Sequence, residues 1–178
     1  DTSISKSRAS GSVSGTTVVG GFAGYAANST ISQCFSLGLA TGTGSNIGGF
    51  AGHFVSGSIA NCYSRGGIQA EQTASNRGGF IGVIERTGCT LTASYSSGPL
   101  TNWDGAFIGA PNGAGQQLEI GSGCYWDSGS THTGDTPDNP DSITGPQSYD
   151  INAGIRPAAW DSAIWQSYPT LAWEHTAP

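Results

Sequence analysis

The sequence predicts an all-β fold, a right-handed parallel β-solenoid (β-helix) of about four turns followed by a C-terminal capping segment. Three observations predict it. A glycine-rich motif returns at nearly constant spacing, a second apolar motif keeps the same phase, and no stretch shows helical apolar spacing in a chain with 29 glycines. We expect solenoid repeats over residues 1–127, and an acidic loop with a tryptophan-rich cap over residues 128–178 of the same domain.

The first motif is G-G-F-x-G, whose copies begin at Gly20, Gly48 and Gly78. Its first glycine returns after 28 and then 30 residues, and a degenerate fourth copy with one inserted residue covers residues 104–109. Each repeat is expected to be one turn of a coil, with short strands about 4.8 Å from their equivalents in the next turn. Equivalent side chains then stack into interior ladders. The predicted phenylalanine ladder consists of Phe22, Phe50, Phe80 and Phe107.

The second motif is [IL]-x-x-[CS]-[FY]-S-x-G, with copies at residues 31–38, 59–66 and 91–98. Because it keeps the phase of the first motif, its apolar first position predicts a second interior ladder. Its aromatic fifth position predicts another ladder, which Tyr125 would continue.

The cysteines occupy a repeat position that serine also fills. Cys34 and Cys62 are 28 residues apart in the second motif, Cys124 fits the same position loosely, and Ser94 replaces cysteine in the third copy. This interchange favours small, buried, reduced thiols, a common role for cysteine. A disulfide stays open as an alternative in an exported protein, but Cys89 is out of phase and no pairing can be deduced.

Composition argues against several classes of partner. The net charge is −6 and the six basic residues form no cluster, so we expect no nucleic-acid binding. No run approaches the roughly 20 apolar residues of a membrane span, and no cofactor motif is present, so neither a span nor a cofactor is expected. The start at Asp1, without a methionine or a signal peptide, indicates a fragment of a larger exported protein.

Together the two motifs resemble the GLUG motif, which occurs in arrays in large bacterial surface proteins and secreted, adhesin-like proteins. The resemblance covers most of residues 4–127 and extends to the Y-W-D at 125–127 and the closing segment 165–173. It implies an extracellular or cell-surface β-solenoid linked with adhesion, and no catalytic residues, because the motif is structural. The chain departs from the pattern at Ala106, at Pro111 and in the glycine-rich run 112–115, which predicts a distorted fourth turn.

The C-terminal segment loses the repeat. An open solenoid end exposes apolar side chains and unpaired strand edges, which invite association unless they are covered. Trp160, Trp165 and Trp173 are therefore expected to cap the end of the coil, with an aromatic ligand site as the alternative. Three aspartates in segment 135–141 could collect a calcium ion, but their spacing is not that of a 12-residue calcium loop. We interpret the segment as a solvated acidic loop and expect no metal.

No catalytic site is predicted. The three histidines lie in unrelated contexts, and the chain carries no nucleophile or zinc-protease motif. Solenoid lyases and glycosidases need two or three carboxylates, or a carboxylate and a cation, on one face. Glu71 and Asp104 lie near related corners about a turn apart, so a pair stays open, and a carbohydrate-active enzyme is the third hypothesis.

We expect a non-catalytic adhesin or ligand-binding module, whose partner is a glycan or a surface protein of a host, prey or neighbouring cell. The alternative is a structural spacer or a tip that self-assembles into homo-oligomers. Sugar rings stack on aromatic faces while nearby carboxylates and amides bond their hydroxyls, which suits a shallow glycan site near the C-terminal end. The candidate ligand-binding residues are Asn102, Trp103, Asp104, Tyr125, Trp126 and Asp127. The competing interpretation is that Tyr125 continues a ladder and Trp126 seals the last turn.

Overall fold

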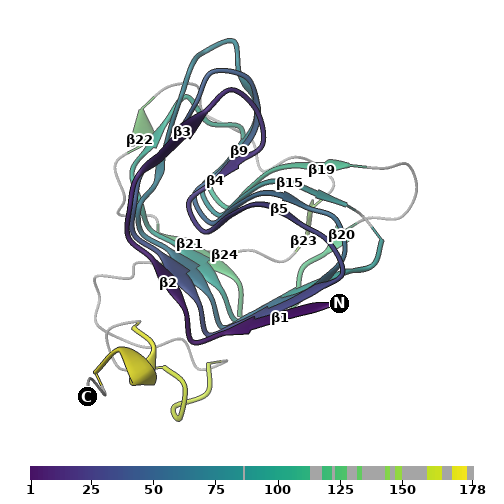
Figure 1. Cartoon of the computed structure of the whole chain (residues 1–178), viewed down its shortest axis with the longest axis vertical. Coiled ribbons are helices and arrows are strands. Elements are labelled where there is room, and N and C mark those ends of the chain that lie inside the picture. The colour runs from purple at the N-terminus through teal and green to yellow at the C-terminus, as the bar shows by residue number, and fades with distance from the viewer. Residues whose placement is uncertain are drawn as a thin grey trace.

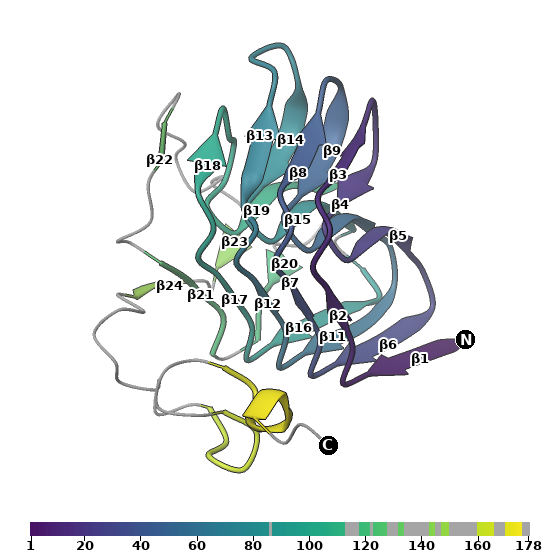
Figure 2. The same cartoon turned by 60° about the vertical axis from the view of Figure 1, so that its left-hand side comes forward.

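The computed structural model shows a parallel β-solenoid of about four turns, which confirms the predicted fold class. It describes residues 1–85, 87–112, 118–121, 123–127, 132–133, 143–144, 147–149, 160–165 and 170–175. Every pairing between named strands is parallel, and these residues contain no α-helix, hence no helix able to cross a membrane. In Figures 1 and 2 the chain winds clockwise as it recedes from the N-terminal end, which makes the coil right-handed.

Three sheets enclose the wedge-shaped lower part of the coil in Figure 1. The floor sheet consists of β1 (Thr2–Ser5), β6 (Ser29–Ser32), β11 (Gly57–Ala60) and β16 (Cys89–Thr92). The roof sheet consists of β5 (Ala23–Ala26), β10 (Ala51–Phe54), β15 (Ile81–Glu85) and β19 (Ile108–Asn112). The corner sheet consists of β2 (Arg8–Ala9), β7 (Phe35–Ser36), β12 (Tyr63–Ser64), β17 (Tyr95–Ser96), β21 (Tyr125–Asp127) and β24 (Gln147–Tyr149).

An arm rises from this wedge, so that each turn is L-shaped in cross-section (Figure 1). Its outer sheet consists of β3 (Val13–Gly15), β8 (Ala40–Gly42), β13 (Ile68–Ala70), β18 (Leu100–Thr101) and β22 (His132–Thr133). Its inner sheet consists of β4 (Val19–Gly20), β9 (Ser45–Gly48) and β14 (Ser75–Gly78). The remaining elements are the strand pair β20 (Leu118–Glu119) and β23 (Ile143–Thr144), and the 3-10 turn η2 (Ala172–His175).

The predicted interior ladders are confirmed. The rings of Phe22, Phe50, Phe80 and Phe107 stack with centroids 4.8, 4.8 and 4.9 Å apart and within 13° of parallel. The floor sheet places Ile31, Ile59 and Leu91 in register, and all three are buried. A second apolar cluster fills the arm, where Val19, Ile47 and Ile68 are buried.

The two motifs are coupled across the interior. Ser36 Oγ donates to the carbonyl of Gly49 at 2.7 Å, and Ser96 Oγ donates to the carbonyl of Ala106 at 2.8 Å. A Cβ atom on Gly49 would collide with Ser64 Oγ of the next turn, so a larger residue would not fit there. The serine of the second motif and the second glycine of the first motif therefore occupy complementary space.

The fourth copy of the first motif is regular, which corrects two expectations. Gly105 forms a β-bridge with Gly78, and Ile108 lies in register with Ile81, so the copy begins at Gly105 and contains no inserted residue. The turn is not distorted at Pro111, which lies in register within β19, whereas residues 113–115 of the glycine-rich run lie outside the described residues. β19 is the last strand of the roof sheet among the described residues, and proline suits such an edge because it lacks a backbone donor.

The cysteine ladder follows the predicted phase. The Cys34 N–H donates to Cys62 Sγ at 3.4 Å, and the Cys62 N–H donates to Ser94 Oγ at 3.1 Å, so the shared side-chain position accepts a bond from the preceding turn. Cys124 is also buried, whereas Cys89 lies in register with Gly57 on the floor sheet. All four cysteines are among the described residues and carry free thiols.

The C-terminal tryptophans lie along the flank of the coil, not across its end, which corrects the predicted position of the cap. The rings of Phe35, Tyr63 and Tyr95 stack outside the corner sheet at 4.7 and 4.9 Å, and residues 160–165 and 170–175 cover them (Figure 2, yellow). The physical reason is that this apolar ladder faces outward over several turns and would otherwise be exposed to water.

Each of the three tryptophans is fixed to a different turn. The indole N–H groups donate from Trp160 to the Gly123 carbonyl at 2.6 Å, from Trp165 to Asn61 Oδ1 at 3.0 Å and from Trp173 to the Gln33 carbonyl at 3.0 Å. Tyr63 also donates its hydroxyl to Glu174 Oε2 at 2.7 Å. The three aspartates of segment 135–141 lie outside the described residues.

Candidate functional site

A charged pair lies at the C-terminal end of the arm, where earlier turns place aliphatic side chains. The inner arm sheet aligns Val19 with Ile47 and Ile47 with Arg77. The Arg77 guanidinium forms a bidentate ion pair with the Asp104 carboxylate, in which Nε donates to Oδ2 at 2.9 Å and Nη2 donates to Oδ1 at 2.6 Å. The Arg77 backbone N–H also donates to Asp104 Oδ2 at 2.8 Å. The arginine side chain is 7% exposed and the aspartate 32%, so the pair is largely shielded from water.

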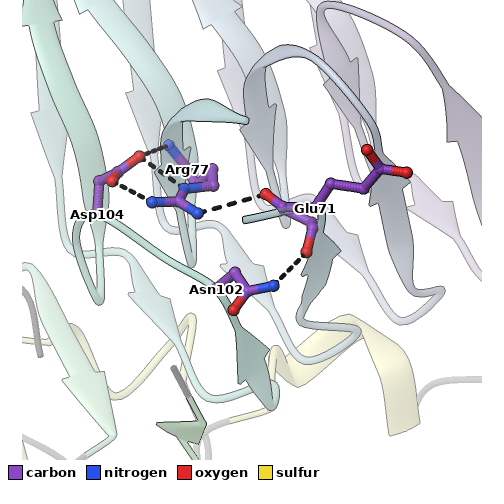
Figure 3. A network of polar contacts seen from close by, with 5 residues as sticks. Glu71, Arg77, Asn102 and Asp104 are labelled. Atoms are coloured by element: carbon purple, nitrogen blue, oxygen red, sulfur yellow. Dashed lines mark hydrogen bonds and ion pairs between the residues drawn. The ribbon is translucent and has the colours of Figure 1, made fainter. Parts of the chain in front are cut away.

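Two further bonds extend this network to the preceding turn (Figure 3). Arg77 Nη1 donates to the backbone carbonyl of Glu71 at 3.4 Å, and Asn102 Nδ2 donates to the carbonyl of Ala70 at 2.8 Å. The network therefore ties the loop that follows β13 to the next turn. It contains Asn102 and Asp104, two of the predicted ligand-binding residues, and both of these use their polar groups inside the fold.

Glu71 and Asp104 do not face each other. In Figure 3 the Glu71 carboxylate points away from Asp104, and Arg77 lies between the two residues. Glycoside cleavage by two carboxylates requires both to flank one bond, with about 5–10 Å between them and room for a substrate. Here the Asp104 carboxylate is bound by the Arg77 guanidinium and the Glu71 carboxylate is exposed. The arrangement is a structural ion pair, and the two carboxylates do not form an acid–base pair.

The other predicted ligand-binding residues pack against three separate clusters. Trp103 packs against the apolar cluster of the arm, Trp126 against the main core, and Tyr125 against the aromatic cluster beneath the C-terminal tryptophans. Tyr125 lies in register with Tyr95 and continues the outer aromatic ladder. Asp127 is 5% exposed. The structure therefore does not bring these four side chains together on one surface.

The roof sheet carries a partly exposed aromatic and polar cluster that sequence reasoning missed. Tyr25 and His53 lie in register on adjacent strands, and Glu85 and Asn112 lie in register on the next two. We call these four residues the roof patch. A signal did exist in the sequence, because counting from the first glycine of each G-G-F-x-G copy puts Tyr25 and His53 at one repeat position and Glu85 at a position two residues later.

Hydrogen bonds link the roof patch from turn to turn. His53 Nε2 lies 3.0 Å from Glu85 Oε1, and Asn112 Nδ2 donates to the same oxygen at 2.7 Å. The Asn112 bond, followed by the smaller effect of His53, holds the pKa of Glu85 below its ordinary value. The ring of Tyr25 meets that of His53 edge to face at 5.3 Å. A carboxylate, an imidazole, an amide and a phenol ring are thus arranged in fixed positions on one outer face.

A metal site is not evident in the part of the chain that the structure describes. No group of three histidine, cysteine or acidic side chains gathers there. The roof patch offers hydrogen-bonding groups and an aromatic ring.

Comparison with known proteins shows a similarity of fold. No protein-family model matches the chain, and no curated protein matches it. A crystal structure described as a "putative immunoglobulin A1 protease" from Bacteroides ovatus superposes with a TM-score of 0.70 over 96% of this chain, at 24% sequence identity. The match spans 57% of that protein. At this identity the similarity shows a common β-solenoid fold and gives no information about the activity of this chain.

Proposed function

We propose that the chain is a non-catalytic ligand-binding module of an extracellular or cell-surface protein, with a glycan or a surface protein as its ligand. The observation that supports it best is the roof patch, where an exposed aromatic ring lies beside polar groups that are already ordered. Preordered groups bind a ligand without a further entropic cost of fixing them, which favours recognition on a rigid surface.

The GLUG resemblance supports the same proposal. The glycines and serines of the two motifs have packing roles, and their apolar residues fill the core, as expected if the repeat is structural. Any specific function must then come from the side chains on the outer faces. We infer that the chain is a GLUG-type repeat module of an adhesin-like bacterial protein.

A structural or self-assembling role is the second candidate, and the first turn of the coil favours it. Strands β1 to β5 each have a strand partner on one side only among the described residues. Ile4 and Phe22 end two interior ladders and stay half-buried. Such an edge can pair with another strand, whether of a preceding repeat or of a second copy of the chain. Concentration-dependent mass by light scattering would support this role, and a monomer at all concentrations would argue against it.

The proposal is tested by presenting the folded chain to a glycan array and to immobilised surface proteins. Immunoglobulin A1 belongs among them, because the structural neighbour is described as acting on it. We expect saturable binding to at least one ligand and no release of reducing ends or peptide fragments from it. Absence of binding throughout would contradict a ligand-binding role, and release of products would contradict a non-catalytic one.

A further inference from the structure

Two side chains of the roof patch, those of Tyr25 and His53, are not required by the ladder on which they lie. The position held by Tyr25 and His53 in two turns is held by Val83 and Ala110 in the next two. Small apolar residues therefore satisfy the packing of this sheet. Tyr25 is also 61% exposed, and it is one of two large hydrophobic residues that the described part of the chain leaves open to water. Since packing does not require a tyrosine or a histidine at this position, a contact with a ligand is the better explanation for these two residues.

The polar part of the patch is ordered before any ligand arrives. His53 and Glu85 have side-chain exposures of only 18% and 23%, and Glu85 Oε1 receives bonds from both neighbouring turns. With its pKa held low chiefly by Asn112, Glu85 stays ionised near neutral pH. Glu85 Oε2 accepts no bond from the described residues, so it can accept one from a ligand hydroxyl.

These groups fit a neutral sugar better than other ligand classes. A pyranose offers an apolar face of C–H groups for an aromatic ring and a rim of hydroxyl donors for carboxylate and amide oxygens. An anionic sugar would be repelled by Glu85, in a chain whose net charge is −6. Peptide recognition by strand addition uses the free backbone of a strand edge, whereas the binding groups of this patch are side chains on the outer face of the roof sheet, from β5 to β19.

We propose that Tyr25, His53, Glu85 and Asn112 form a shallow binding site for a neutral pyranose unit of a surface glycan. Tyr25 supplies the stacking face, and Glu85 accepts a sugar hydroxyl bond while His53 and Asn112 hold its carboxylate in place. This site rests on the proposed ligand-binding function and names its ligand class. It is separate from the C-terminal residues that the sequence predicted.

The test compares binding of neutral and sialylated glycans on one array by the wild type and by Y25A, E85Q and L37A. Leu37 is a matched control, because it is the other exposed large hydrophobic residue in the described part of the chain and is 41% exposed. We expect Y25A to weaken binding of neutral glycans about tenfold or more, E85Q to weaken it severalfold, and L37A to leave it unchanged. Circular dichroism and the thermal midpoint of each variant verify that it is folded.

The outcomes separate the two proposals. Glycan binding by the wild type that survives both Y25A and E85Q overturns the roof site while the ligand-binding function stands, and W103A and W126A then locate the site. Binding of sialylated glycans alone overturns the neutral-sugar assignment. A wild type that binds no glycan overturns the roof site as a glycan site, and binding to immobilised surface proteins then decides whether the ligand-binding function survives.

Discussion

Replacement of Phe50 by alanine tests how much one rung of the phenylalanine ladder contributes to stability. Phe50 is fully buried and stacks on Phe22 and Phe80 at 4.8 Å on either side. The substitution removes two stacked contacts and leaves a cavity that the rigid turns cannot close. We expect a loss of about 3–5 kcal/mol, as for other large-to-small core replacements. That is a large part of the roughly 5–15 kcal/mol that stabilises a typical domain.

Urea unfolding, followed by circular dichroism, measures this loss as the change in the free energy of unfolding. Phe22→Ala is the matched control, since Phe22 stacks on one neighbour and is only partly buried. We expect it to cost roughly half as much. A loss below about 1 kcal/mol for Phe50→Ala, or equal losses for the two variants, would refute the ladder as the main source of stability.

Three other features give predictions of their own. Arg77→Ala should lower the free energy of unfolding in urea by roughly 2–3 kcal/mol, because it leaves the Asp104 carboxylate without its cation. Replacing both residues by leucine should recover most of this loss. An unchanged free energy of unfolding in Arg77→Ala would show that the ion pair does not stabilise the fold. Burial raises the pKa of Cys124 from 9.0 to about 12, so its thiol stabilises the fold fully below pH 9 and this contribution is lost between pH 9 and pH 12. The urea midpoint should fall over that range, less steeply in Cys124→Ser, and identical slopes would contradict the assignment. Trp165→Ala should cost about 3–5 kcal/mol and raise the acrylamide quenching of the remaining tryptophans, and a stable variant with unchanged quenching would show that the C-terminal segment is not docked.

The interior of the fold was predictable because a solenoid converts sequence phase into spatial position. Residues at one repeat position stack directly, so the spacing of Phe22, Phe50 and Phe80 along the chain was enough to predict their ladder. The fourth copy of the first motif was predicted to begin one residue too early. Asp104 was counted as part of the motif there, whereas it lies opposite Arg77 and the motif begins at Gly105.

The candidate site was less predictable because adjacent residues of a strand point to opposite faces. Tyr125 and Trp126 are neighbours in the sequence, yet one packs against the outer aromatic cluster and the other against the core. The roof patch instead combines residues about one turn apart, such as His53 and Glu85, and its bonds cross between turns. Repeat position could predict that these residues lie near one another, but only the structure shows the hydrogen bonds that connect them. The C-terminal segment is held on the flank by contacts between residues far apart in the sequence. Trp165, for example, donates a hydrogen bond to Asn61, which lies 104 residues earlier. The repeat pattern gives no indication of such contacts.

The central claim, that this solenoid binds a glycan and leaves it chemically intact, is tested most directly by calorimetric titration with the strongest glycan from the array, followed by mass spectrometry of the recovered glycan. The account predicts saturable heat, a stoichiometry of about one glycan per chain, and recovery of the glycan at its original mass. Absence of heat, or recovery of shortened or unsaturated products, would contradict it.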